Sequence, residues 1–170
     1  MTAEVEKRRQ RVSQRLDPAR RAEFGQFFTP DPVARFLASM FELRDWPAAL
    51  LDPGAGVGSL TAAFTERWAS VCAAPLKVSA CEVDASLHGE LRSTLEECEN
   101  HAGVTAELLG ANFIEWSTDR LAGLGLEEPP SFDYVIQNPP YKKLAGGSHD
   151  RRLLQSLGIR APNIYAAFLG

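Results

Sequence analysis

The residues that most clearly indicate a chemical role form the run Asn138-Pro139-Pro140-Tyr141, which directly follows an apolar segment. An amino group on an aromatic ring is a poor nucleophile, because its lone pair is delocalised into the ring. The Asn138 side-chain oxygen and the Pro139 carbonyl can each accept one N–H of such a group and so favour a pyramidal nitrogen. The prolines stiffen the backbone and carry no competing N–H, and Tyr141 offers a flat face on which a base can stack for about 1–3 kcal/mol. The run predicts a site that aligns an amino nitrogen with a methyl donor, with a plain rigid turn as the alternative.

A second informative segment is the glycine-rich run Asp-Pro-Gly-Ala-Gly-Val-Gly over residues 52–58. Glycines let the backbone pass close to a ligand. A helix beginning at Ser59 or Leu60 would present free N–H groups and partial positive charge to a carboxylate or phosphate. The run lacks the terminal Gly-Lys-Ser/Thr of a P-loop, which disfavours ATP, but alone it still fits a dinucleotide, another nucleotide or a tight turn. Its candidate ligand-binding residues are Asp52, Pro53, Gly54, Gly56 and Gly58.

Polar residues also follow the next two predicted strands. Glu82 comes after the second strand, near the place where an acidic side chain can accept hydrogen bonds from both hydroxyls of a ribose. A solvated glutamate at a strand end is the alternative. Asn112 and Phe113 follow the third strand, where the Phe113 ring could face an adenine and the Asn112 amide could bond to its edge. Ordinary core packing by Phe113 is the alternative there.

These segments are separated by a regular alternation of predicted strands and helices. The alternation is typical of a parallel sheet with right-handed crossovers. In such a sheet ligands bind outside the carboxyl ends of the strands. The residues singled out above all end or follow strands, so we expect them on one rim of an α/β, Rossmann-like fold. Strands are predicted at 48–51, 77–83, 105–111 and 132–137, and helices at 31–41, 59–69, 85–99, 115–123, 150–157 and 163–169.

Composition limits the remaining possibilities. With 170 residues, 45% of them hydrophobic, the chain could form one domain that buries about two-thirds of its unfolded surface. It has no apolar run of the roughly 20 residues that a membrane span needs, and its N-terminus lacks the apolar core of a signal peptide. The cysteines, Cys72, Cys81 and Cys98, have no metal-type spacing. A cytoplasmic protein with reduced thiols and without zinc is therefore expected.

Charge is unevenly distributed along the chain. Residues 1–24 carry a net +3, residues 25–141 a net −11 and residues 142–170 a net +4. Residues 3–22 are mostly charged and predict an exposed or partner-seeking helix, broken near Pro18. Both basic ends could contact phosphate, although composition alone favours an ordinary solvated surface. The candidates for phosphate contact are the helix over Lys7–Arg21 and the residues Lys142, Lys143, Arg151 and Arg152.

Taken together, the chain resembles the amino-methylating DNA methyltransferases, and in motif order the adenine-N6 enzymes of the gamma arrangement. The run Gly-Gln-Phe-Phe-Thr-Pro over residues 25–30 is similar to that family's N-terminal cofactor motif, and residues 52–58 to its methionine-binding turn. Glu82-Val83 matches its ribose and adenine contact, residues 111–113 its adenine-edge motif, and residues 163–169 the helix that shapes the cofactor pocket. The resemblance implies S-adenosyl-L-methionine as cofactor and no metal. It implies a catalytic loop of Asn138, Pro139, Pro140 and Tyr141, and cofactor-binding residues Phe28, Thr29, Pro30, Asp52, Pro53, Gly54, Gly56, Gly58, Glu82, Val83, Asn112 and Phe113.

The chain departs from this family in what it contains. Asn112 stands where the family usually has Asp, but an amide oxygen can still accept from the adenine amino group, so a modest effect on cofactor affinity is expected. The family continues with three more strands, a second aromatic that stacks on the extruded base, and a target-recognition domain. We therefore expect a basic helical extension over residues 1–24 and a partial catalytic domain over 25–170, truncated after its fourth strand. Residues 132–137 would then lie at an open sheet edge, exposed to solvent or to another chain.

The function implied is S-adenosylmethionine-dependent methylation of adenine N6 in DNA, in a restriction–modification or related bacterial defence system. Double-stranded DNA would be the partner, recognised through the absent C-terminal part, and the target adenine would be flipped out at a cost of a few kcal/mol. The isolated chain is expected to show no turnover. Protein glutamine-N5 and ribosomal RNA guanine-N2 methyltransferases also use an Asn-Pro-Pro-aromatic loop and are alternatives. A third is a non-catalytic fragment that binds cofactor, or a partner chain that completes its sheet.

Overall fold

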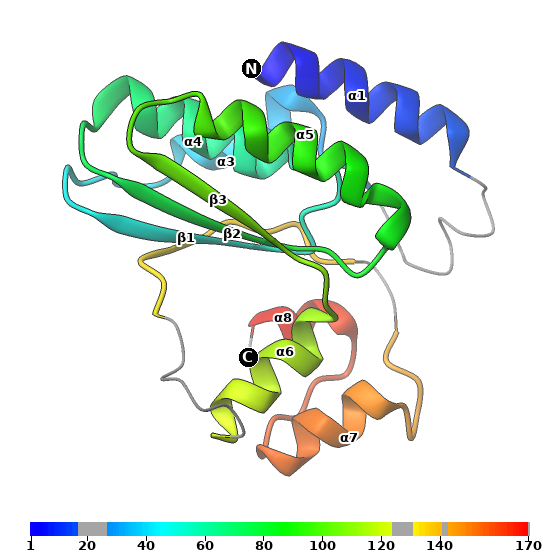
Figure 1. The fold of residues 1–170 in the computed structure, drawn as a ribbon. Coiled ribbons are helices and arrows are strands. Elements are labelled where there is room, and N and C mark those ends of the chain that lie inside the picture. Colours follow the sequence, from blue (N-terminus) through cyan, green and yellow to red (C-terminus); the bar gives the residue numbers. More distant parts are fainter. Residues whose placement is uncertain (17–26, 124–130, 141–142, 170) are drawn as a thin grey trace.

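The computed structural model describes residues 1–16, 27–123, 131–140 and 143–169. It contains a four-stranded sheet in the order β3-β2-β1-β4, in which every neighbouring pair is parallel (Figure 1). The strands are β1 (Ala48–Pro53), β2 (Leu76–Cys81), β3 (Val104–Leu109) and β4 (Tyr134–Val135). The predicted parallel α/β sheet is confirmed.

The fourth strand is shorter than the sequence predicted. Of the described strands, β4 pairs with β1 alone, through Leu50 with Tyr134 and Leu51 with Val135. It occupies the end of the strand order, and its Val135 side chain is 44% exposed. The expected open edge is therefore present among the described residues. The Asp133 and Ile136 N–H groups still donate to the Ala49 and Leu51 carbonyls at 2.9 and 3.0 Å, so the segment runs along β1 on both sides of β4.

One face of the sheet is covered by α3 (Asp31–Ser39), α4 (Ser59–Val71) and α5 (His88–Glu99), the last preceded by a 3₁₀ turn, η1 (Ala85–Leu87) (Figure 1). The helices α3 and α4 begin where the sequence predicts, because a proline near its start pre-organises α3 and the glycine turn ends at Gly58, directly before α4. The predicted helix over 85–99 begins as η1 and continues as α5 from His88. The apolar stripes that they present meet buried strand residues in one core. Its fully buried members include Leu50, Phe64, Trp68, Val78 and Leu91.

A second, smaller core lies on the other side of the sheet, among α6 (Phe113–Leu121), α7 (His149–Ser156) and α8 (Ile164–Leu169) (Figure 1). Ser148 caps α7 by accepting a hydrogen bond from the Arg151 N–H. The buried members of this cluster are Ile114, Leu144, Leu154, Ala161 and Ala167. In the described part of the chain, no helix is both long enough and apolar enough to cross a bilayer.

The N-terminal helix α1 (Thr2–Arg15) is not the exposed or partner-seeking helix that its composition suggested. It packs against α4 and α3, and Thr2, Val5 and Arg8 are 3%, 1% and 6% exposed. Its Glu6 carboxylate accepts the Asp31 N–H at 3.2 Å, so it also holds the start of α3. The prediction failed because the buried side of α1 carries two polar residues, Thr2 and Arg8, beside Val5, so that a mostly charged composition conceals a packed face. Pro18 and the expected boundary between residues 24 and 25 lie outside the described residues.

Arg8 shows why a charged helix can be buried. Its guanidinium donates to Thr94 Oγ1 at 2.8 Å and to Glu97 at 2.6 Å, and it pairs with Glu90 at 3.3 Å. Its charge is thus neutralised within the fold, and the adjacent Arg9 donates to Glu6 at 2.7 and 2.8 Å. These two arginines are not available to contact phosphate, contrary to the expectation for the basic N-terminal segment.

Arg8→Ala is expected to destabilise the chain by roughly 1.5–3 kcal/mol, the usual value of hydrogen bonds to a charged group. The variant also leaves two carboxylates without their cation. Chemical denaturation monitored by circular dichroism measures the change. Lys7→Ala is the matched control, because the Lys7–Glu4 pair is exposed, and such pairs contribute about 0–1 kcal/mol. Equal destabilisation by both variants would contradict the role assigned to Arg8.

Candidate functional site

The glycine turn lies between β1 and α4 and has a backbone that requires glycine. Gly54, Gly56 and Gly58 have φ angles of 76°, 60° and 84°, in the left-handed region that other L-residues rarely adopt. The N–H groups of Gly54 and Ala55 donate to the Cys81 carbonyl at 2.8 and 2.9 Å, which fastens the turn to the end of β2. A Cβ at Gly58 would lie 2.7 Å from Thr94 Cγ2.

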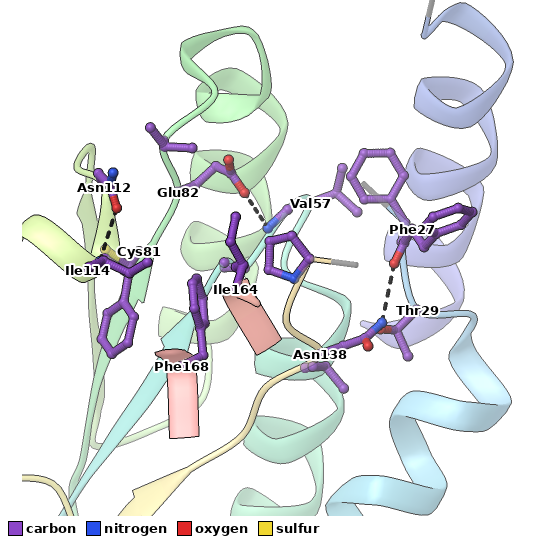
Figure 2. A pocket seen from close by; sticks show the side chains of 18 of the residues that line it. Phe27, Thr29, Val57, Cys81, Glu82, Asn112, Ile114, Asn138, Ile164 and Phe168 are labelled. Atoms are coloured by element: carbon purple, nitrogen blue, oxygen red, sulfur yellow. Dashed lines mark hydrogen bonds between the residues drawn. The ribbon is translucent and has the colours of Figure 1, made fainter. Parts of the chain in front are cut away.

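This turn forms one side of a cavity of about 270 Å³ at the carboxyl ends of the four strands (Figure 2). Ten of the sixteen predicted site residues line it. Those from the segment before α3, from the glycine turn and from the end of β2 are Phe28, Thr29, Gly54, Gly56, Glu82 and Val83. Those that follow β3 and β4 are Asn112, Phe113, Asn138 and Pro140. The expectation that residues at strand ends would meet on one rim therefore holds for eight of these ten, and the other two, Phe28 and Thr29, reach the cavity from the segment before α3.

Five of the other predicted residues do not line the cavity: Pro30, Asp52, Pro53, Gly58 and Pro139. Asp52 is 0% exposed and turns toward α4, where its Oδ2 accepts from the Thr61 N–H at 3.2 Å and from Thr61 Oγ1 at 2.6 Å. It therefore supports the turn from behind. Gly58 packs against Thr94 and Leu91, on the side of α5. Tyr141, the sixteenth residue, lies outside the described residues.

Burial acts strongly on Asp52. It raises the pKa of this carboxyl to about 7, and the negative charge of Glu82 adds to the rise, while the hydrogen bonds from Thr61 oppose it. The Oδ1 atom is buried and has no hydrogen-bond partner in the described part of the chain. A buried carboxyl group with one oxygen that lacks a hydrogen-bond donor favours its neutral form. The stability of the fold therefore depends on whether Asp52 is protonated.

Glu82 combines burial with a position in the cavity wall. It is 5% exposed. One carboxylate oxygen accepts the Gly56 N–H (Figure 2) and the other accepts the Asp84 N–H, each at 2.8 Å. Burial raises the pKa of Glu82, whereas these two backbone hydrogen bonds lower it. Each oxygen keeps a second lone pair, so the carboxylate is fixed in place and can accept two further hydrogen bonds from a ligand.

Asn138 follows β4, at the end of the sheet opposite β3, and is held by the segment before α3. Its Nδ2 donates to Thr29 Oγ1 at 3.1 Å and to the Phe27 carbonyl at 3.3 Å (Figure 2). Both contacts take the amide nitrogen, so the side-chain oxygen is left as an acceptor. Thr29 therefore orients the amide of Asn138, a residue that is far away in the sequence.

Asn112 lines the cavity but uses its side chain for local contacts. As the N-cap of α6, its Oδ1 accepts the Ile114 N–H at 3.0 Å. Its Nδ2 donates to Asp150 Oδ1 on α7 at 2.9 Å. Asp150 also lines the cavity. The predicted contact of Asn112 with a ligand edge therefore competes with two contacts inside the protein.

Several wall residues were not singled out from the sequence. Asp150 was hidden because a carboxylate at the start of a short helix is an ordinary helix-terminus residue. Phe27 was part of a recognised motif, yet no pattern gave it a role. Ile164 and Phe168 of α8 line the cavity, as expected for a helix that shapes the pocket, and the Phe168 ring lies 4.9 Å from the Phe113 ring. These apolar side chains give one end of the cavity its walls.

Solved structures of known proteins share this fold. A Listeria monocytogenes protein assigned to the class I S-adenosylmethionine-dependent methyltransferases has a TM-score of 0.61 and 16% identity, over 99% of this chain and 48% of its own. The methyltransferase subunit of a type I restriction–modification system from Streptococcus thermophilus has a TM-score of 0.57 and 20% identity, over 89% of this chain and 33% of its own. The predicted Rossmann-like methyltransferase fold is confirmed.

Sequence comparison is more specific. The type II methyltransferase M.BsuBI of Bacillus subtilis is 36% identical over 153 residues, which is 88% of this chain and 30% of that protein. The type II methyltransferase M.PstI of Providencia stuartii is 32% identical, over 97% of this chain and 33% of that protein. The chain thus spans about a third of the length of these curated relatives. The family described as N-6 DNA methylase matches residues 14–155, and the chain therefore belongs to the N-6 DNA methylase family.

Proposed function

We propose that this chain carries the cofactor pocket and the catalytic loop of an S-adenosylmethionine-dependent DNA adenine-N6 methyltransferase of a restriction–modification system. The observation that carries the proposal is the arrangement of Asn138. Its amide nitrogen is bound by Thr29 and Phe27, and its oxygen remains as an acceptor at the same cavity as Glu82 and the glycine turn. That is the arrangement needed to hold an amino group beside a bound methyl donor.

The donor groups of the cavity fit the parts of S-adenosylmethionine in the order of the strands. Across the sheet, Asn112 follows β3, Glu82 follows β2, the glycine turn follows β1 and Asn138 follows β4. A ribose fits Glu82, whose oxygens are fixed by backbone donors. The methionine part fits the glycine turn, where a Cβ at Gly56 would lie 3.0 Å from the Phe28 ring. The reacting carbon then belongs on the Asn138 side.

The chemistry required of the protein is modest. S-adenosylmethionine, when bound, supplies a methyl group on a positively charged sulfur, which is a good leaving group. The Asn138 oxygen accepts one N–H of the target amino group, and the Pro139 carbonyl is proposed to accept the other. These hydrogen bonds strengthen as the nitrogen gains positive charge, which is where preorganised acceptors accelerate a reaction most. Tyr141 is proposed to stack on the target base.

DNA contacts are proposed for the basic segment that follows the catalytic loop. Lys143 and Arg152 are exposed, and Arg151 is partly buried at the start of α7. Residues 142–170 carry a net +4 against −11 for residues 25–141. Phosphate attraction depends on such local charge rather than on the total. Lys142 was predicted with this group and lies outside the described residues.

Completion of the sheet by a further segment or a partner chain is also proposed. β4 has its only described partner in β1, and Val135 is 44% exposed. The helix α3 exposes Val33 and Phe36, at 46% and 64%, and Met40, which directly follows it, is 68% exposed. An open sheet edge together with exposed apolar side chains favours association with another strand and with an element that covers it.

Calorimetric titration of the 170-residue chain with S-adenosylmethionine tests the cofactor part of this proposal. We expect binding by the unaltered chain and about 10- to 100-fold weaker binding by Glu82→Gln, since hydrogen bonds to a charged group contribute roughly 1.5–3 kcal/mol. Glu96→Gln, at an exposed position of α5, is the matched control and should bind like the unaltered chain. A chain that is folded by circular dichroism but gives no binding heat would refute the proposed pocket.

Turnover tests the substrate part. No methyl transfer to duplex DNA is expected from the 170-residue chain, which spans about a third of its curated relatives. Transfer by the chain alone would show that the base-binding site is already complete in these residues. For a longer protein that contains this chain, methylation of ribosomal RNA or a release factor in place of DNA adenine would contradict the assigned substrate.

A further inference from the structure

The carboxylate of Asp150 has no assigned task in the site described above. Residues 142–170 contain five lysines and arginines and a single acid, Asp150. In the described residues Asp150 forms no ion pair with a neighbouring arginine. Its Oδ1 instead accepts a hydrogen bond from Asn112 Nδ2 at 2.9 Å, and its side chain lines the cavity. The position of the Asp150 carboxylate is therefore set by the Asn112 amide and not by an ion pair with Arg151 or Arg152.

The Asn112 amide determines how Asp150 is presented. Asn112 Oδ1 accepts the Ile114 N–H at 3.0 Å, so the amide cannot rotate without losing the N-cap of α6. Its nitrogen is therefore directed to Asp150 Oδ1. The other oxygen of Asp150 has no hydrogen-bond donor among the described residues. Because an ionised carboxylate only accepts hydrogen bonds, this oxygen requires an N–H or O–H from a ligand or from water.

The position of this oxygen along the rim indicates which part of a ligand it meets. The strand order places Asn112 and Asp150 at the β3 end, separated from Asn138 by the ends of β2 and β1. Phe113, Ile114 and Phe168 contribute apolar walls to the cavity, and Phe113 and Ile114 directly follow Asn112 in the chain. An apolar wall with one acceptor beside it suits a purine ring that carries an exocyclic amino group.

We propose that Asp150, oriented by Asn112, is the residue that selects the adenine base of the cofactor by accepting a hydrogen bond from its 6-amino group. The inference rests on the proposed function, and it moves the base-edge contact from residue 112 to residue 150. Asn112 is a positioning residue in this arrangement. A 6-oxo purine in the same position places an oxygen against the carboxylate, so that both groups accept and neither donates.

The experiment compares two ligands, S-adenosylhomocysteine and its 6-oxo counterpart S-inosylhomocysteine, by calorimetric titration of the 170-residue chain. The unaltered chain is expected to bind the adenine ligand about 10- to 100-fold more tightly, because the 6-oxo ligand leaves opposed acceptors unsatisfied. In Asp150→Asn the new Oδ1 is expected to take the Asn112 N–H. The new Nδ2 then faces the base and donates to a 6-oxo group. The ratio of the two affinities should fall at least tenfold or reverse.

The ratio separates selection from support of the fold, because structural damage weakens both ligands alike. Asp119→Asn, an exposed aspartate on α6, is the matched control and should keep the original ratio. If the unaltered chain binds neither ligand, the proposed function fails. If it binds S-adenosylhomocysteine but Asp150→Asn leaves the ratio unchanged, the assignment of Asp150 is overturned and the proposed function stands.

Discussion

Gly58→Ala is expected to destabilise the folded chain by roughly 2–5 kcal/mol. Gly58 has a φ of 84°, and an L-residue in the left-handed region costs about 1–2 kcal/mol. The new Cβ would also lie 2.7 Å from Thr94 Cγ2 and 3.1 Å from Leu91 Cδ1. Both neighbours are 0% exposed and cannot move into solvent, and overpacking of this kind costs about 1–3 kcal/mol.

The damage should extend from the fold to the cofactor pocket. Thr94 donates its hydroxyl to the Val57 carbonyl at 2.7 Å and accepts from Arg8 at 2.8 Å. Val57 belongs to the cavity wall. A side chain at position 58 that displaces Thr94 therefore shifts the turn that is proposed to receive the methionine part of the cofactor. Weaker binding of S-adenosylmethionine should accompany the loss of stability.

Urea denaturation measures the stability, with Gly89→Ala as the matched control. Gly89 lies in α5, and apart from its chain neighbours and the backbone of its own helix no described heavy atom lies within 4 Å of the position where its Cβ would be. Replacement of a helical glycine by alanine commonly stabilises by up to about 1 kcal/mol. The same chemical change is therefore expected to have opposite signs at the two positions. Similar midpoints for the two variants would contradict the packing described for Gly58.

Asp52→Asn is expected to remove a large part of the pH dependence of stability. The pKa of Asp52 in the folded chain is about 7, compared with an ordinary 3.8. The folded chain therefore retains a proton between pH 4 and 7 that the unfolded chain releases. Stability must fall as the pH rises through this range. At 1.36 kcal/mol per pH unit, the difference corresponds to about 4 kcal/mol in the limit.

The measurement is a series of urea denaturation experiments from pH 4 to pH 8 on the unaltered chain and on Asp52→Asn. The asparagine stays neutral and can still accept the two hydrogen bonds from Thr61. The variant should match the unaltered chain near pH 4 and exceed its stability by up to about 4 kcal/mol near pH 8. Asp119→Asn, at an exposed position, should follow the unaltered chain at every pH. Parallel pH profiles for Asp52→Asn and the unaltered chain would mean that Asp52 is ionised in the fold.

Much of the scaffold was predictable because its signals are local. Alternating apolar segments and turn residues gave the four parallel strands, and the rule that ligands bind at strand ends placed Glu82 and Asn138 at one cavity. The glycine turn was predictable for the same reason, since each of its three glycines has the positive φ angle that selects this residue. Periodicity and turn chemistry depend on neighbours in the sequence, which a single sequence contains.

What could not be predicted depends on partners that are distant in the sequence. Asn112 and Asp150 are 38 residues apart, and Asn138 and Thr29 are 109 apart. Nothing in the local pattern of α1 indicates that Arg8 would be buried against α5. The direction of the Asp52 side chain could not be predicted for the same reason, because its burial depends on how α4 packs over the end of β1. A residue type shows what chemistry is available, and the tertiary contacts show where that chemistry is directed.

The contacts of Arg8 also have a consequence for synthesis of the protein. Its partners Thr94 and Glu97 follow it by 86 and 89 residues. At a translation rate of about 5–20 residues per second, the ribosome needs roughly 5–20 seconds to reach them. During that interval the 14-residue helix can pack on α3 and α4, but Arg8 still lacks its partners on α5, and helices of this length are marginal in water. The helix α1 thus completes its contacts only after α5 has been made, and until then it is more exposed to chaperones and proteases than in the finished fold.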